Sequence, residues 1–305
     1  MDVEFLREYL QYTLSTGISL STERTSIVQN SLRVLQDQAK FRHMYFWGII
    51  YGTSKDYYVA YGVRNDALDR IFYYSLDGIA WVLIPNPLSN ENAITLTLDC
   101  RTRFQGDPML VREVEDIAAK ELTVHLEDSP DSEAESNVHN LEVQVENEDG
   151  SDRNLKEEDR LACVVTAITE EAFALPRRAL FKVPNKIGSV VFNKFFQGLN
   201  DIESTKLNNY VHYREPRNKW NTNLLQSSAA NYSTDFLDAV DVDVPKYRNW
   251  SVIHSYDQMI VINKCLLWHG SVFFHVVDTS RYGNCYFGYG LKNYDLPFYL
   301  SPSLS

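Results

Sequence analysis

The sequence predicts an α+β fold, in which an N-terminal helical hairpin precedes antiparallel β-meanders with short helices. Three observations support this prediction. Apolar residues recur at helical spacing in residues 1–40, the pattern changes to alternation within residues 41–112, and alternation returns after residue 250. An acidic stretch in the middle of the chain, expected to be disordered over residues 129–150, separates the two β-rich regions.

Two helices are predicted before residue 41. The first ends at Gly17, and Ser21 is expected to cap the second, with Glu23 placed in its first turn where negative charge suits the helix dipole. The apolar positions of the two helices are Val3, Phe5, Leu6, Tyr9, Leu10 and Leu14, then Val28, Leu32, Leu35 and Ala39.

Strands are predicted at about 41–51, 57–63, 71–75 and 80–84, separated by turns rich in Asp, Asn, Gly and Pro. In the first strand, glycines interrupt the alternation of large residues at Gly48 and Gly52. Such glycines indicate a β-bulge or a close approach of two backbones.

The second half of the chain, residues 160–300, is predicted to be α+β within a single domain that spans residues 1–305. Strands are expected at 163–165 and 173–175, and short helices at 201–210 and 234–240. Four further strands are predicted to form a C-terminal antiparallel sheet, at 250–255, 259–265, 271–278 and 282–289.

Charge is distributed unevenly along the chain. The formal net charge is −12, but residues 113–159 hold 17 Asp and Glu against 3 Lys and Arg, so the rest of the chain is close to neutral. A basic face for nucleic acid or for an anionic membrane is therefore not expected.

Neither a signal-peptide pattern nor an apolar run of transmembrane length is visible, so a cytosolic protein is expected. The four cysteines, Cys100, Cys163, Cys265 and Cys285, are far apart in the sequence and lie in apolar segments. We expect reduced and mostly buried thiols rather than a disulfide framework.

Catalytic and metal-binding patterns are weak. Cys265, His269, His275 and Cys285 are residue types that bind zinc, but they lack the paired spacing of zinc sites, and strand residues of the core are the simpler interpretation. A nucleophile from Cys163 or Cys265 with His212 or His254 has no more support than any chain with several Cys and His would give. No phosphate-binding, dinucleotide-binding or nucleophile-elbow motif is present, so neither an enzyme nor a cofactor is predicted.

Aromatic residues are the stronger signal, with 39 Phe, Trp and Tyr in the chain. Tyrosine and tryptophan favour protein interfaces, because they combine a large apolar body with a polar group. Tyr57, Tyr58, Tyr282 and Tyr286 are the candidate interface residues. For Trp47, Trp81 and Trp268 we favour a role in the core.

The acidic stretch has two interpretations. It is either a solvated loop or an element that steers charged neighbours. Ser129 precedes Pro130, and Ser132 stands three residues before Glu135, so both serines are candidate phosphorylation sites.

The runs FWGIIYG at 46–52 and DYYVAYG at 56–62 resemble those of radial spoke head proteins, and later segments narrow the resemblance to the radial spoke head protein 9 family. The later segments, which occur in the same order, are ALPRRALFK at 174–182, FQGL at 196–199, VHYREP within 210–216 and KNYDLPF at 292–298. One departure is Arg178, because related chains tend to have glycine there, and glycine tolerates positive φ better than arginine does.

The resemblance implies a non-catalytic structural subunit of the radial spoke head in the axoneme of motile cilia and flagella. It implies a role in head assembly and in mechanical signalling between radial spokes and central pair that controls beating. The implied partners are spoke head proteins of the 4 and 6 type, a second copy of the chain and, indirectly, central-pair projections. The alternative is a soluble interaction module acting through its acidic loop; an uncharacterised hydrolase with a site in the C-terminal sheet is a further rival.

Overall fold

The structure is a computed structural model that describes residues 1–87, 91–113, 154–184, 189–217, 231–243, 249–255 and 259–295. The chain divides into two compact units. The larger comprises residues 1–84, 103–107 and 164–305, and the smaller comprises residues 85–102 and 108–163.

The N-terminal region forms the predicted helical hairpin. Helix α1 covers Leu6–Tyr12, a 3₁₀ turn (η1) covers Leu14–Thr16, and helix α2 covers Thr22–Ala39. Gly17 ends the first segment with a left-handed φ of 82°, which glycine adopts without a steric penalty. The Ser21 side chain accepts a hydrogen bond from the Arg24 amide, so the predicted N-cap is confirmed.

Both predicted meanders are present. Strands β1 (His43–Ile50), β2 (Tyr57–Val63), β3 (Arg70–Ser75) and β4 (Val82–Leu83) pair antiparallel in chain order. The C-terminal strands β11 (Trp250–His254), β12 (Ile260–Cys265), β13 (Ser271–Val276) and β14 (Tyr282–Gly288) do the same.

The two meanders are not separate sheets. Strand β1 pairs parallel with β14, which gives one mixed eight-stranded sheet of order β11-β12-β13-β14-β1-β2-β3-β4. Next to this parallel pair, residues 1–3 lie along β1: the Phe46 amide donates to the Met1 carbonyl and the Val3 amide donates to the Met44 carbonyl. The first residues of the chain and its last strand therefore share one side of β1.

Gly48 permits the parallel pairing. It lies opposite Tyr286 at a β-bulge with a φ of 144°, and a Cβ at this position would stand 1.9 Å from the Tyr286 carbonyl oxygen. Only glycine can bring the two backbones so close. The bulge and close approach predicted from the glycine pattern are confirmed.

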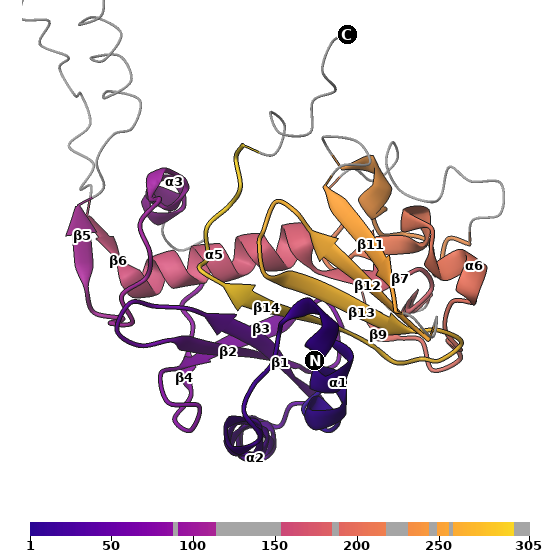
Figure 1. Cartoon of the computed structure of the whole chain (residues 1–305), viewed down its shortest axis with the longest axis horizontal. Coiled ribbons are helices and arrows are strands. Elements are labelled where there is room, and N and C mark those ends of the chain that lie inside the picture. Colours follow the sequence, from indigo (N-terminus) through magenta and orange to yellow (C-terminus); the bar gives the residue numbers. More distant parts are fainter. Residues whose placement is uncertain are drawn as a thin grey trace, which may run out of the picture. The chain divides into compact units, whose positions relative to one another are not determined.

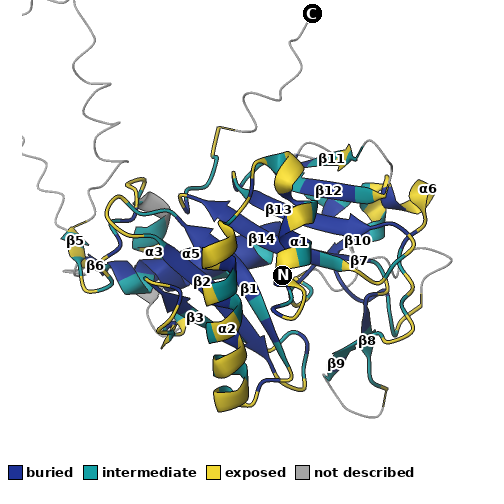
Figure 2. Ribbon diagram, turned by 60° about the horizontal axis from the view of Figure 1, so that its bottom comes forward, coloured by how far each residue is buried: buried dark blue, intermediate teal, exposed yellow. Residues whose placement is uncertain are grey.

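The sheet carries helices on both faces, α1 and α2 on one and residues 164–172 of α5 (Glu157–Ala172) on the other (Figure 1). The core on the first face contains Leu6, Leu10 and Leu32 of the helices and Phe46 and Phe274 of the sheet. Figure 2 shows the sheet buried and the outer side of α2 exposed. This arrangement follows from the helical spacing of apolar residues in the first 40 residues.

Trp47 fixes residues 164–172 of α5 against the second face. Its ring is fully buried, stacks on Phe173 with ring centroids 5.6 Å apart and lies 5.3 Å from the Tyr286 ring. The indole N–H donates to Thr169 Oγ1 at 2.8 Å. The core role favoured for Trp47 is confirmed.

The strand predicted at 163–165 is wrong, because these residues lie in α5. Burial recurs there at Leu161, Val165, Ile168 and Ala172, which is a helical and not an alternating spacing. Three acidic residues in the first turn, starting at Glu157, suit the helix N-terminus. The β-branched pair Val164 and Val165 favours a strand, and for this reason the sequence pattern did not predict the helix.

Short elements complete the larger unit. Strand β7 (Ala174–Pro176), near the predicted position, pairs with β10 (Tyr210–His212), and β8 (Leu180–Lys182) pairs with β9 (Val190–Phe192). The predicted helix at 201–210 is two shorter pieces, α6 (Asp201–Ser204) and the 3₁₀ turn η3 (Leu207–Asn209).

The helix predicted at 234–240 is wrong. The segment runs beside β10, where the His212 amide donates to the Asp238 carbonyl and Ala239 bridges to Val211. The Asp235 side chain pairs with Arg177. Only Val240–Val242 (η5) forms a 3₁₀ turn.

The smaller unit contains α3 (Glu91–Asp99), β5 (Val111–Glu113), β6 (Asn154–Lys156) and the first residues of α5. Its core cluster consists of Ala93, Leu155 and Cys163. The acidic loop predicted at 129–150 and the candidate phosphorylation sites Ser129 and Ser132 lie outside the described residues.

Gly48→Ala is expected to lower the free energy of unfolding by at least about 3 kcal/mol, because it adds both backbone strain and a collision with the Tyr286 carbonyl. Gly17→Ala is the matched control. Its φ is also positive, at 82°, but no atom lies within 4 Å of the added Cβ, so we expect a loss of only about 1 kcal/mol. Urea unfolding measures the free energy of unfolding of both variants. Equal losses would show that the close approach of β1 and β14 does not require glycine at position 48.

Arg178 is the position at which the sequence departs from related chains, and it has a φ of 70° with an exposed side chain. Arg178→Gly is therefore expected to raise the free energy of unfolding by about 1 kcal/mol. Arg177→Gly is the contrasting variant, because the Arg177 guanidinium donates two hydrogen bonds, of 2.7 and 2.9 Å, to the buried Asp235 carboxylate. Leaving that carboxylate unpaired should cost roughly 3 kcal/mol. The melting temperature in thermal unfolding should therefore rise for Arg178→Gly and fall for Arg177→Gly. A shift in the same direction for both variants would contradict the different roles given to the two arginines.

Candidate functional site

The four tyrosines predicted as interface residues lie mostly in the interior of the chain. Tyr57 and Tyr286 are fully buried, Tyr58 is 6% exposed, and Tyr282 is half-buried. Tyr57 packs edge-on against Tyr74 and Phe104. These rings contact other elements of the same chain, and contact with a partner stays a prediction.

The residues considered for a metal site have other contacts. The Leu199 amide donates to His275 Nε2 at 3.0 Å, so Nδ1 carries the proton and donates to the Arg281 carbonyl at 3.2 Å. Burial raises the pKa of the Cys265 and Cys285 thiols to about 12, which keeps both protonated. Within the described residues no group of three or more His, Cys, Asp or Glu could hold a metal ion.

The candidate Cys-His pairs are not assembled either. His212 Nε2 contacts the Asp243 carboxylate at 2.9 Å, and the same carboxylate accepts a hydrogen bond from the Trp250 indole. In the described part of the chain, neither Cys163 nor Cys265 has a histidine as a hydrogen-bond partner. All four cysteines are free thiols, three of them buried and Cys100 half-buried.

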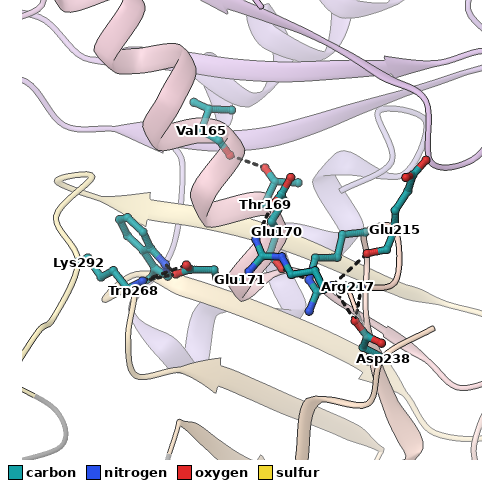
Figure 3. Close-up of polar contacts among 10 residues, drawn as sticks. Val165, Thr169, Glu170, Glu171, Glu215, Arg217, Asp238, Trp268 and Lys292 are labelled. Atoms are coloured by element: carbon teal, nitrogen blue, oxygen red, sulfur yellow. Dashed lines mark hydrogen bonds and ion pairs between the residues drawn. The ribbon is translucent and has the colours of Figure 1, made fainter. Parts of the chain in front are cut away.

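A polar network surrounds the C-terminal end of α5 (Figure 3). Glu171 accepts hydrogen bonds from the Trp268 indole at 2.8 Å and from Lys292 Nζ at 2.9 Å. On the adjacent position, Glu170 pairs with Arg217. Cations near the last turn of a helix also oppose its dipole.

The same network extends to Asp238, which is 3% exposed. Its Oδ2 accepts hydrogen bonds from Arg214 and from the Arg217 amide, both at 2.8 Å. The Arg214 guanidinium also donates to the Glu170 carbonyl. The end of α5 is therefore attached to three other chain segments, which supports a rigid body rather than a reaction centre.

Large apolar side chains at the surface are better candidates for contact with another protein. Among the large apolar side chains of the described residues, Phe195 is the most exposed, at 92%, followed by Ile202 and Met109 at 70% each. Aromatic alternation in strands does not indicate these residues, because they lie in turns or short elements. The described residues include no helix that is both long enough and apolar enough to span a membrane.

Comparison with known proteins decides the family. A family model for radial spokehead-like proteins matches residues 2–159. Proteins named radial spoke head protein 9 homolog are 36% identical in Danio rerio, 37% in Bos taurus and 34% in Homo sapiens, each over 98% of this chain and the full length of the relative. The chain belongs to the radial spoke head protein 9 family.

Membership confirms the resemblance found in the sequence and places the chain among the components of the radial spoke head, in the axoneme of cilia and flagella. It indicates association with other radial spoke components and favours a non-enzymatic role. The run that carried the resemblance, residues 46–52, provides both the glycine at the β1–β14 junction and the tryptophan that holds α5.

His275 makes the stability of this family member depend on pH. Burial is the main cause that lowers its pKa from 6.5 to about 4. Below pH 6.5 the unfolded chain binds a proton that the folded chain does not, so the free energy of unfolding falls as the pH falls toward 4. The full loss at pH 4 is about 3 kcal/mol.

His275→Gln removes this titration while keeping one acceptor and one donor for the Leu199 amide and the Arg281 carbonyl. Between pH 7 and pH 5 the parent is expected to lose about 2 kcal/mol more than the variant in urea unfolding. Parallel curves for the two proteins would show that the pKa of His275 is not lowered in the folded chain.

Proposed function

We propose that this protein is a structural subunit needed for assembly of the radial spoke head and for mechanical signalling between radial spokes and central pair. The observation that carries the proposal is the match to radial spoke head protein 9 homologs over nearly the whole chain. The motif residues Trp47 and Gly48 lie at the centre of the eight-stranded sheet, which supports a structural role for this run.

Transmission of force needs a body that does not yield locally. The larger unit meets this requirement in two ways: its sheet joins the first and last parts of the chain, and α5 is attached at its end by the contacts of Glu170, Glu171 and Asp238. Close-packed interiors have low compressibility and pass strain on to their neighbours.

The proposed partners are spoke head proteins of the 4 and 6 type, which carry a similar Trp-Gly and Tyr-Tyr signature, together with a second copy of the chain. Contact with central-pair projections would follow indirectly, through the assembled head. A role of this kind requires no cofactor, and loss of the protein should disturb beating without removing an enzymatic turnover.

The test is to express the chain with a C-terminal tag in ciliated cells that lack their own copy, because Met1 is fully buried and an N-terminal tag would disturb it. We expect the tagged protein to be recovered from isolated axonemes with other spoke head proteins in fixed ratio, and normal beating to return. Pull-down with mass spectrometry and high-speed imaging provide the two measurements.

Two variants separate the alternatives. Gly48→Ala should fail to join axonemes because it destabilises the sheet. Deletion of residues 129–150 should leave assembly intact, whereas an interaction module acting through the acidic loop would lose its partner. Recovery of the parent only from the soluble fraction, without spoke proteins, would contradict the proposed function.

A further inference from the structure

A groove of about 650 Å³ lies between the β8–β9 hairpin and the adjoining ends of β1 and β2. We call it the β9 groove. Its apolar lining comes from Val63, Ala67, Phe181, Val191, Phe192 and Phe195. Val63 and Ala67 are buried, the lining residues Phe181, Val191 and Phe192 are half-buried, and Phe195 is 92% exposed. Figure 2 shows the hairpin standing out beside the eight-stranded sheet.

The hairpin is attached, so the groove is formed before any partner arrives. The Ala67 amide donates to the Val190 carbonyl at 2.8 Å, and the Val190 amide donates to the Asp66 carboxylate at 3.2 Å. The Phe192 ring packs edge-on against His43 with centroids 5.7 Å apart. A preformed site avoids part of the ordering cost of binding.

The exposed Phe195 is held in place by its own turn. Asn193 Oδ1 accepts the Phe195 amide at 3.0 Å, and Asn193 Nδ2 donates to the Arg178 carbonyl at 3.0 Å. The Asn193 amide also donates to the Ala179 carbonyl. The turn therefore presents a large ring to solvent at a defined position, an arrangement that is typical of an anchor for a partner.

The rim of the groove is positively charged. Arg42, Arg64 and Lys194 line it and are exposed, and no Asp or Glu is among the described residues of the lining. Within the described residues none of these three cations forms an ion pair with a carboxylate; Arg64 lies only over the Phe41 ring, 5.5 Å from its centroid. The groove thus combines an apolar floor with three cationic groups that lack a counter-charge in the described structure.

We propose that the β9 groove binds an acidic segment of a partner protein that also carries aromatic or aliphatic side chains. The apolar side chains of the segment contact Phe195 and Phe192, and its carboxylates meet Arg42, Arg64 and Lys194. Complementary charge of this kind fixes the orientation of a segment and selects against basic competitors. The proposal deepens the proposed function by giving the chemistry of one partner, and it rests on that function for where the partner is met.

Nucleic acid fits the groove less well than such a segment. Single-stranded nucleic acid needs a cationic track along the backbone together with faces for stacking. Here the surface is mainly apolar, and the cations stand only at the rim.

The experiment uses the purified full chain and a fluorescent peptide in which Glu and Asp are interspersed with Leu and Phe. We expect saturable binding by fluorescence anisotropy that weakens as salt is raised, because the ion pairs are screened. Phe195→Ser and the double variant Arg64→Glu with Lys194→Glu should each weaken binding by about tenfold or more. All three substituted side chains are exposed, so thermal unfolding should be unchanged.

Matched controls are Ile202→Ser, which removes another exposed apolar side chain, and Arg33→Glu, which reverses an exposed charge on α2. Both should bind like the parent. Three results would overturn the proposal: no binding, equal binding of a peptide with Lys in place of the acidic residues, or equal binding of a single-stranded oligonucleotide. A dimer of the chain that Phe195→Ser abolishes would also overturn it, in favour of a second copy as the occupant.

The peptide measurement and the axoneme measurement can fail independently. If the parent chain does not bind the peptide but enters axonemes normally, the proposed groove is contradicted and the structural role stands. If the chain binds the peptide but never enters axonemes, the structural role is contradicted and the groove proposal stands.

Discussion

The close approach of the Gly48 and Tyr286 backbones is the constraint on which the rest of the larger unit depends. It joins two meanders into a single sheet through strands β1 and β14, which lie more than 200 residues apart in the sequence. Without it, each meander would have an unpaired edge strand and half of a core. Because β1 then lies in the middle of the sheet, its two faces can hold α1 and α2 on one side and residues 164–172 of α5 on the other.

The neighbouring Trp47 packs the paired strands β1 and β14 against helix α5. Its ring touches Phe173 and Tyr286, and its N–H reaches Thr169, so one side chain links β1, β14 and α5. Beyond Thr169, the helix ends in the contacts of Glu170 and Glu171 with Arg217, Trp268 and Lys292. A chain of packed and charged contacts therefore runs from the sheet centre to the end of α5. This continuity suits a protein whose family belongs to a mechanical assembly.

The exposed aromatic side chains are not the ones that the sequence pattern predicts. The tyrosines that the sequence marks as interface candidates are mostly used inside the chain, whereas Phe195, in a short turn with no alternating pattern, stands in solvent beside three cations. Residue type alone could not separate these cases, because tyrosine and phenylalanine both bury a large ring either in a core or at an interface. Exposure is decided by which element packs above each ring.

By itself, the sequence indicated the family, through the resemblance of its runs at 46–52 and 56–62 to those of radial spoke head proteins. It also determined the helical hairpin and both meanders, because these elements depend on local periodicity, on capping at Ser21 and on glycines that interrupt a strand. It also indicated the bulge at Gly48. It did not determine the parallel β1–β14 pair, since contacts between distant segments leave no local period. Nor did it determine helix α5, where the β-branched pair at Val164 and Val165 favoured a strand and burial between elements overrode that preference. The β9 groove likewise exists only in the tertiary structure, because its lining comes from four separate parts of the chain.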